Sequence, residues 1–235
     1  MDDNNLYHLS ESFLSIQGEG NHAGALSLFI RFHFCNLTCS WCDSKYTWNL
    51  KSGKYKTYVT AEIKDMISEN SAYHVIFTGG EPALYRLDRL VVRGKQYHVE
   101  SSGSIIPTEP LDIVFKDNNR IVREAMDESI IKTFNWVISP KLSNSRQVLN
   151  EPGLRFWAAR DYCIFKFIVR NTTDIDEVAA IVKQFAIDRK KVYIALEGQT
   201  LESQLKPDLV DRIIERGYNF SPRLHIMLWG AKRGK

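Results

Sequence analysis

The sequence lacks an apolar run long enough to span a membrane, because even residues 25–34 are interrupted by Arg31. It also lacks the basic and then apolar start of a signal peptide, since residues 1–5 are acidic and polar. No repeat, low-complexity block or linker rich in Pro, Gly and Ser divides the chain. We therefore expect no membrane association and a single domain over residues 1–235 with small insertions.

The sequence also has little net charge and few cysteines. The formal net charge is only +3, which is too weak to argue for a nucleic-acid partner. Charged residues make up 25% and hydrophobic residues 44% of the chain, which is typical of an ordinary globular protein. Three of the 4 cysteines lie close together, so a disulfide framework is a poor explanation and we expect a reducing cytoplasm.

The scarce cysteines gather in the segment CNLTCSWC at residues 35–42, directly after an apolar run. Three neighbouring thiolates suit an iron–sulfur cluster, whereas a structural zinc site needs a fourth Cys or His nearby. Cys163 lies far along the chain in an apolar run, and we interpret it as a buried small hydrophobic residue. A [4Fe–4S] cluster with three thiolate ligands leaves one iron open to a small molecule. A zinc knuckle, or three unrelated thiols, is the alternative.

Apolar runs alternate with helical patterns along the chain, which predicts β-α-β units and a mostly parallel sheet. Strands are expected at residues 26–34, 74–77, 96–99, 111–115, 136–139, 163–169, 192–196 and 224–229. Helices are expected after an N-cap at Thr60 and over residues 84–91, 174–185 and 206–216, with irregular or connecting chain at 47–58 and 116–128. About six parallel strands are too few for a closed eight-stranded barrel, so we expect an open, partial parallel β/α barrel.

Several predicted strands end in polar or glycine-rich turns. Gly79-Gly80-Glu81 follows one strand, Glu100 and Ser102 follow the next, and Ser139 and Lys141 follow another. Because ligand sites of parallel α/β sheets lie at the carboxyl ends of the strands, these residues are candidates for ligand contacts. Ordinary strand-end caps explain them almost equally well.

The Cys-x3-Cys-x2-Cys spacing, with Trp41 before the last Cys, resembles the signature of the radical S-adenosylmethionine (SAM) enzymes. The resemblance implies a radical SAM domain whose [4Fe–4S] cluster is bound by Cys35, Cys39 and Cys42. It implies SAM at the open iron, where an electron from the reduced cluster yields a 5′-deoxyadenosyl radical. It also implies SAM contacts from Trp41, Gly79, Gly80, Glu81, Glu100, Ser102, Ser139 and Lys141. Glu81 would accept from the methionine ammonium.

Further motifs look like those of 7-carboxy-7-deazaguanine synthases: SIQGEG at residues 15–20, Arg31, CDS at 42–44, His225 and WG at 229–230. The resemblance runs from about residue 12 to the last residue. It implies a lyase that contracts the ring of 6-carboxy-5,6,7,8-tetrahydropterin, releasing ammonia and 7-carboxy-7-deazaguanine, in queuosine and 7-deazapurine biosynthesis. The radical would remove hydrogen from C6 and later return it, regenerating SAM. A homodimer and a reductant such as a flavodoxin are also implied.

The resemblance implies five substrate contacts, from Gln17, Glu19, Arg31, Glu197 and His225. A pterin edge carries N–H donors that a Glu carboxylate accepts, while a Gln amide both donates and accepts. The Arg guanidinium offers the substrate carboxylate a fork of donors, and a salt bridge at the barrel rim is its alternative. The alternatives for His225 and Glu197 are a core histidine and a structural carboxylate.

Ser44 stands where the family often has Thr, whose hydroxyl ligates a magnesium ion that also touches the substrate. Serine keeps that oxygen, so the resemblance implies Mg²⁺ binding at Ser44, with a turn cap as the alternative. Asp43 either ligates the ion too or caps the same turn. Residues 231–235 either fold over the site or fray.

Two other functions compete with this interpretation. A radical SAM activase would generate a glycyl radical on a partner protein, although the extra Cys clusters that some activases carry are absent from the sequence. A non-catalytic zinc-binding nucleic-acid module would be colourless and would expose aromatic side chains among Lys and Arg. An iron–sulfur protein would instead be brown, with about four irons per chain.

Overall fold

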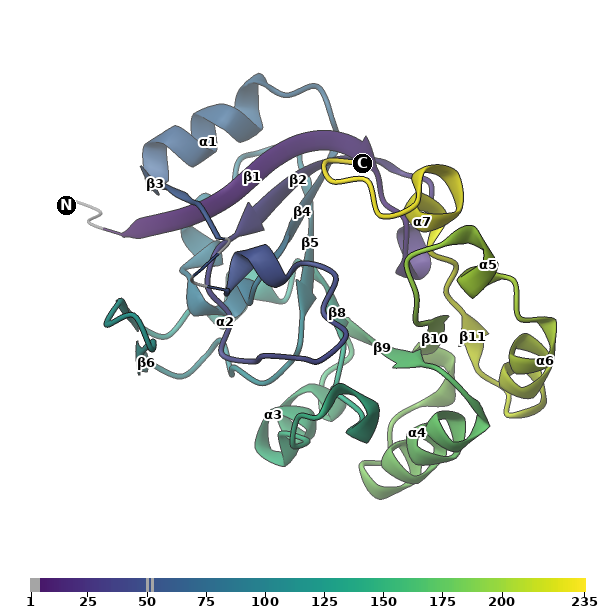
Figure 1. Cartoon of the computed structure of the whole chain (residues 1–235). Coiled ribbons are helices and arrows are strands. Elements are labelled where there is room, and N and C mark those ends of the chain that lie inside the picture. Colours follow the sequence, from purple (N-terminus) through teal and green to yellow (C-terminus); the bar gives the residue numbers. More distant parts are fainter. Residues whose placement is uncertain (1–4, 50, 52) are drawn as a thin grey trace.

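The computed structural model describes residues 5–49, 51 and 53–235. A sheet with the strand order β11-β10-β9-β8-β5-β4-β2-β1-β3 forms the centre of the molecule (Figure 1). Its strands are β1 (Leu6–Ile16), β2 (Leu26–Phe32), β3 (Lys56–Val59), β4 (His74–Gly79), β5 (Gln96–Ser101), β8 (Asn135–Ile138), β9 (Cys163–Val169), β10 (Val192–Leu196) and β11 (Asn219–Phe220). The predicted strands at 163–169 and 192–196 therefore have the bounds that the apolar runs indicated.

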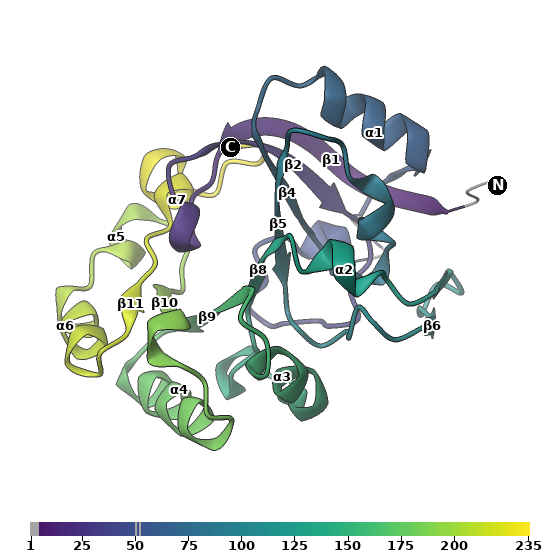
Figure 2. The same ribbon diagram turned by 180° about the vertical axis from the view of Figure 1, so that it is seen from behind.

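The middle of the sheet is parallel. Strands β2, β4, β5, β8, β9 and β10 run parallel to one another, and β11 adds a short parallel strand beyond β10. Strands β1 and β3 are antiparallel at the other side. In the described ranges, β3 and β11 are the two edges of the curved sheet, so the barrel is open (Figures 1 and 2). The predicted fold class, an open parallel β/α barrel, is confirmed.

Helices α1, α3, α4 and α6 lie on the outer side of the curved sheet (Figures 1 and 2). The helices are α1 (Thr60–Glu69), α2 (Glu128–Ile131), α3 (Glu151–Ala158), α4 (Thr172–Gln184), α5 (Leu201–Gln204), α6 (Pro207–Glu215) and α7 (Leu224–Trp229). Helix α4 begins after Asn171, whose side chain accepts from the backbone N–H of Asp174, and it buries Ile175, Val178 and Val182. The helices predicted at 174–185 and 206–216 are confirmed. The helix predicted after Thr60 also forms, but its N-cap is Val59 and Thr60 is already helical.

The helix predicted over residues 84–91 is wrong, because the chain forms two short 3₁₀ turns there. These turns are η3 (Pro82–Leu84) and η4 (Leu87–Leu90). Leu84, Leu87 and Leu90 are fully buried, and their spacing of three residues matches the period of a 3₁₀ helix. The other 3₁₀ turns are η1 (Gly20–His22), η2 (Lys45–Thr47), η5 (Ser143–Ser145) and η6 (Arg189–Lys191).

Two connecting segments contain more strand than expected. The predicted strand at 111–115 forms β6 (Leu111–Val114), but it pairs only with β7 (Arg120–Arg123) in a separate antiparallel hairpin. Residues 116–128 are therefore not a plain connector, and Asn118 turns the hairpin with a left-handed φ of 65°. Residues 47–58, expected to be irregular, end in β3, while residues 50 and 52 lie outside the described part.

The strand predicted at residues 224–229 is wrong, because this segment is helix α7. Arg223 and Ile226 are buried while Met227 and Leu228 are exposed, a spacing typical of a helix rather than of an alternating strand. The place beside β10 is already taken by β11. The chain turns instead, and the N–H of Leu224 donates to the carbonyl of Gly18 at 2.9 Å, which holds α7 beside the loop that follows β1.

The hydrophobic core fills the space between the sheet and the outer helices. Trp136, Trp157 and Phe167 are almost fully buried. Strand β9 is buried on both faces, as expected for the middle of a parallel sheet, yet one of its inward side chains is Lys166. Among the described residues, no helix is both long and apolar enough to cross a membrane.

We expect Phe167→Ala to lower the free energy of unfolding by about 3–5 kcal/mol, because it removes a fully buried aromatic ring from the central sheet. Leu26→Ala is a matched control in β2, where the side chain is 52% exposed, and it should change stability by less than about 0.5 kcal/mol. Urea unfolding followed by circular dichroism measures both. Equal losses for the two variants would contradict this assignment of the core.

Candidate active site

A cleft of about 300 Å³ opens at the carboxyl ends of the parallel strands. The loop after β2, the ends of β4, β5, β8 and β10, and helix α7 all contribute to its wall. The residues predicted for the site that line it are Gln17, Glu19, Arg31, Cys35, Cys39, Trp41, Cys42, Ser44, Gly79, Gly80, Glu100, Ser102, Ser139, Lys141, Glu197 and His225. The structure therefore brings almost all of them together, and Glu81 is the exception.

The three clustered cysteines are free thiols on one wall of the cleft. The backbone N–H of Leu37 donates to Cys35 Sγ and the indole N–H of Trp48 donates to Cys42 Sγ, each at 3.4 Å. Burial raises the pKa of all three thiols, and the charges of Glu81, Cys42 and Cys39 raise that of Cys35 further. Three thiols on one cleft wall, two of them with N–H donors, fit the ligands of an iron–sulfur cluster. Cys163 is buried elsewhere, with its Sγ 3.3 Å from the carbonyl of Trp157.

Gly79 and Gly80 are required by the close approach of two backbone segments. A Cβ at Gly80 would lie 1.8 Å from the carbonyl oxygen of Phe34, and one at Gly79 would lie 2.3 Å from that of Phe32. Gly79 also has a φ of 122°, which only glycine adopts readily. These two glycines let the end of β4 support the segment that leads into the cysteine loop.

Glu81 does not line the cleft, and its expected contact with SAM stays a prediction. Its side chain is fully buried, and its carboxylate accepts hydrogen bonds from the hydroxyls of Ser101 and Ser102, at 2.7 and 2.5 Å. The backbone N–H groups of Ala83 and Ser102 donate to the same carboxylate at 3.1 and 2.9 Å. A carboxylate has about four acceptor positions, so these contacts fill it. Glu81 thus joins the ends of β4 and β5.

A network of ion pairs, built on the buried side chains of Lys166 and Arg223, crosses the cleft. Lys166 Nζ lies 2.5 Å from Glu19 Oε2 and 2.7 Å from Glu100 Oε2. Arg223 lies 2.9 Å from Glu19 Oε1 and 2.6 Å from Asp43 Oδ2. The sequence analysis missed Lys166 and Arg223. A charged residue within the apolar run of β9 was a signal for Lys166, whereas no local pattern indicated Arg223.

The network keeps its members ionised. Burial alone would raise the pKa of Glu19, but attraction by Lys166 and Arg223 outweighs it and holds that pKa well below its usual value. Burial alone would lower the pKa of Lys166, but attraction by Glu100 and Glu19 outweighs it and raises that pKa. Glu19 is therefore a carboxylate acceptor throughout the neutral pH range.

His225 lies on α7 rather than on a strand, with Nε2 3.7 Å from Glu19 Oε1. Burial lowers the pKa of His225 despite the opposing attraction of Glu19, so the ring is neutral at neutral pH and has one donor and one acceptor nitrogen. A Cβ at Gly18 would lie 2.2 Å from His225 Nδ1, so glycine is needed there for α7 to pack.

Arg31 and Ser44 are neighbours on the wall beside the cysteine loop. Arg31 Nε donates to Glu11 Oε1 at 2.8 Å, which is the rim salt bridge considered as the alternative, yet Arg31 also lines the cleft. Its Nη1 lies 3.4 Å from Ser44 Oγ, and the Ser44 hydroxyl donates to Asp43 Oδ1 at 2.9 Å. Ser44 and Asp43 thus place two oxygen atoms side by side.

The remaining predicted residues are held by partners around the cleft. Trp41 Nε1 donates to Asn144 Oδ1 at 2.9 Å, and Lys141 Nζ lies 5.6 Å from the centre of the Trp41 ring. Lys141 Nζ also donates to Ser139 Oγ at 3.0 Å, and Glu197 lies 3.5 Å from the Nε of Arg170.

Residues 230–235 line the cleft, so the C-terminal segment folds over the site. Arg233 donates to Glu11 Oε2 at 2.7 Å and stacks on Tyr46 at 4.0 Å from the ring centre. Tyr46 in turn donates to Glu11 Oε1 at 2.7 Å, so Glu11 is the residue that holds this segment.

Comparison with known proteins agrees with this geometry. Residues 29–130 match the model of the radical SAM superfamily. The fold resembles the crystal structure of QueE from Escherichia coli, with a TM-score of 0.69 and 22% identity over 94% of this chain and 95% of that one. With its three cleft cysteines, the chain is a radical SAM enzyme.

The 7-carboxy-7-deazaguanine synthases of Hyperthermus butylicus and Pyrobaculum aerophilum are 33% and 31% identical to this chain. The alignments cover 96% of this chain in both cases, and 94% and 96% of the two relatives. The chain belongs to the 7-carboxy-7-deazaguanine synthase family.

We expect Lys166→Met to lower the free energy of unfolding by about 3–5 kcal/mol at neutral pH, because it leaves Glu100 without its cation and Glu19 with Arg223 alone. Since pairing lowers the pKa of Glu19, the stabilisation is complete above its ordinary value of 4.5 and is lost as the pH falls toward the lowered pKa. The difference between wild type and variant should therefore shrink below pH 4.5. Urea unfolding of iron-free, reduced protein over a pH series measures it.

Arg120→Met is the matched control, because Arg120 pairs with Asp112 on the exposed β6–β7 hairpin. Its urea midpoint should stay at the wild-type value. A Lys166→Met variant that is as stable as wild type at neutral pH would contradict the role of the buried network.

Proposed function

We propose that this protein converts 6-carboxy-5,6,7,8-tetrahydropterin into 7-carboxy-7-deazaguanine and ammonia, a radical SAM ring contraction in queuosine and 7-deazapurine biosynthesis. Family membership supports the reaction class. The observation that carries the proposal is that one cleft combines the three cysteine thiols with the ion-paired carboxylate of Glu19. Radical generation and recognition of a nitrogen-rich ring would thus occur side by side.

Cys35, Cys39 and Cys42 would hold the [4Fe–4S] cluster. With SAM bound, the cluster supplies the 5′-deoxyadenosyl radical that starts the reaction. Gly79 and Gly80 leave their part of the wall without side chains, which lets a ligand approach the backbone. Lys141, fixed by Ser139 and Trp41, would pair with the carboxylate of SAM. Ser102 would contact SAM through its uncharged hydroxyl. Glu100 would act mainly by holding Lys166 and Gln17 in place.

Glu19 would accept the N–H donors of the pterin edge. Lys166 and Arg223 hold its carboxylate ionised and fixed, so it needs no reorganisation to receive these donors. Gln17 is buried beside it and donates to Glu100 at 3.0 Å. Arg31 would pair with the substrate carboxylate, while neutral His225 and Glu197 would complete the polar wall.

The volume of the cleft favours a small molecule. At about 300 Å³ it matches the lower end of pockets for small ligands. The alternative activase would have to admit a peptide segment of a partner protein to the same place. Residues 230–235, which cover the cleft, would have to move away for that.

Ser44 would hold the Mg²⁺ ion together with the substrate. Its hydroxyl and Asp43 Oδ1 are 2.9 Å apart, and oxygen donors of this kind suit a hard cation. Asp43 Oδ2 is engaged by Arg223, so Asp43 would offer the ion only Oδ1. The nearby Arg31 would hold the substrate carboxylate against the same ion.

A homodimer, a reductant such as a flavodoxin and a location in the reducing cytoplasm complete the proposal. The apolar side chains of Leu201 on α5, Leu205 directly after α5 and Leu228 on α7 are exposed. Helices α5 and α7 contact each other, and these side chains support a contact with a second copy. Reduced thiols are the expected state of Cys35, Cys39 and Cys42 in such a compartment.

The reconstituted protein should form 7-carboxy-7-deazaguanine and ammonia from carboxytetrahydropterin, SAM and dithionite without oxygen. Product is measured by chromatography with mass spectrometry, and we expect about four irons per chain. Cys39→Ala should lose iron and product together, because it removes a ligand. Cys163→Ala, at a buried cysteine outside the cleft, is the matched control and should keep the iron. Cleavage of SAM with no product from the pterin would overturn the substrate assignment.

We expect Ser44→Ala to raise the Mg²⁺ concentration needed for half-maximal turnover by at least about 10-fold, because it removes one oxygen ligand. Ser44→Thr keeps the hydroxyl and should restore the wild-type dependence. Ser68→Ala on α1, where the hydroxyl bonds only to the carbonyl of Asp65 in the same helix, is the control. If Ser44→Ala shows the wild-type response to Mg²⁺, this serine is not a ligand.

A further inference from the structure

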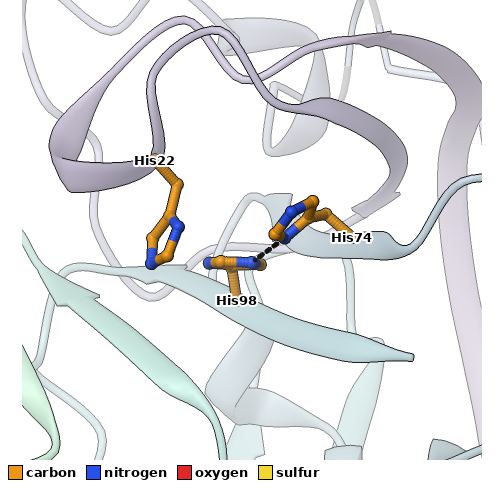
Figure 3. Close-up of side chains that lie close together, drawn as sticks. All are labelled: His22, His74 and His98. Carbon is orange, nitrogen blue, oxygen red and sulfur yellow. Dashed lines mark hydrogen bonds between the residues drawn. The ribbon is translucent and has the colours of Figure 1, made fainter. Parts of the chain in front are cut away.

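Three histidines that the proposed reaction does not use lie together, away from the cleft. His22 belongs to η1, His74 begins β4, and His98 lies in β5 (Figure 3). A ring nitrogen of each lies within 4.8 Å of a ring nitrogen of the other two. His98 is two residues before Glu100, so both side chains point into the barrel, with Glu100 at the cleft and His98 toward the amino-terminal ends of the strands.

The fold places the three rings from three separate segments. The pairing of β4 with β5 sets Ile76 opposite His98, which puts His74 and His98 on the same face of the sheet. His22 reaches them from the loop after β1 (Figure 3). That loop is fixed by Gly20, which has a φ of 70° and whose N–H donates to Ser221 Oγ at 2.8 Å.

The rings have the chemistry of metal ligands. A neutral imidazole ring has one nitrogen lone pair that can bind a metal ion. Imidazole nitrogen suits Zn²⁺, Ni²⁺, Cu²⁺ and Fe²⁺ rather than Mg²⁺.

The spacing of the rings is close to that of a tetrahedral site. Bonds of about 2.0–2.1 Å to zinc place two ligand nitrogens roughly 3.4 Å apart. His74 Nδ1 and His98 Nε2 now share a hydrogen bond of 2.8 Å, and the His22 ring centre lies 4.5 Å from that of His98. A small rotation of the rings would equalise these separations. The hydrogen bond joins only His74 and His98, while the His22 ring meets the His98 ring at 71°.

We propose that His22, His74 and His98 form a second metal site, which binds Zn²⁺ or a similar divalent transition-metal ion and leaves a fourth position open to water. The site ties η1 to β4 and β5. Because η1 follows directly after Gln17 and Glu19, the ion also fixes the loop that carries these two residues. The proposal uses no residue of the cleft, so it stands or falls independently of the reaction.

The test uses the holoenzyme, in which the iron–sulfur cluster occupies the cleft cysteines. One equivalent of Zn²⁺ is added, free metal is removed, and zinc is measured by elemental analysis and X-ray absorption at the zinc edge. We expect one zinc per chain with three imidazole nitrogens at about 2.0–2.1 Å. Failure to retain zinc, or sulfur at about 2.3 Å in the zinc shell, would overturn the proposal.

Variants separate this site from adventitious binding. His22→Gln, on a partly exposed turn, and His74→Gln should each raise the Kd for Zn²⁺ in equilibrium dialysis by at least about 10-fold. Zinc should raise the melting temperature of wild type but not of these variants. His8→Gln is the matched control, since His8 packs against Phe34 and Tyr55 in a different ring cluster, and it should bind zinc as wild type does. Wild-type affinity in both His22→Gln and His74→Gln would contradict the assignment.

Discussion

The pairing of Lys166 with Glu19 and Glu100 is the interaction on which the arrangement of the cleft depends. It joins the loop after β1, strand β5 and strand β9 across the inside of the barrel. Removing a charge from water is costly, so each member of the group is tolerated only while its partners are in place. Arg223 extends the group to Asp43, which adjoins Cys42. One set of ion-paired charges therefore connects the cysteine loop, the Glu19 carboxylate and the segment before α7.

A second constraint is the contact between the end of β4 and the start of the cysteine loop. Gly80 lies so close to the carbonyl of Phe34 that no side chain fits between them. The carboxylate of the next residue, Glu81, accepts hydrogen bonds from Ser101 and Ser102 that hold β4 to β5. The Gly-Gly-Glu segment thus builds the wall behind the ligands, and in this chain only its glycines reach the cleft surface. The two glycines therefore position the cysteine loop in addition to leaving space in the cleft.

The sequence alone indicated the parts of the fold that follow from local patterns. Strands β9 and β10 were predictable because they are buried on both faces and read as continuous apolar runs. Helix α7 was not, because six largely apolar residues without a clear period fit a strand as well as a helix, and the presence of β11 decides between them. The cysteine loop could be recognised from its spacing. The partners of Glu19 could not, since Lys166 and Arg223 are separated from it by 147 and 204 residues.

The short segment from Gln17 to His22 joins the two ends of the barrel. Gln17 and Glu19 face the cleft, whereas His22 reaches the histidines at the amino-terminal ends of the strands. Gly18 and Gly20 give this segment the room and the φ that it needs, but glycines also make ordering a segment costly in entropy. Contacts along the segment offset that cost. Glu19 pairs with Lys166 and Arg223, the N–H of Gly20 donates to Ser221, and His22 packs against His98. A change at the histidines would therefore be transmitted to the Glu19 carboxylate through the backbone of Gly20 and Asn21.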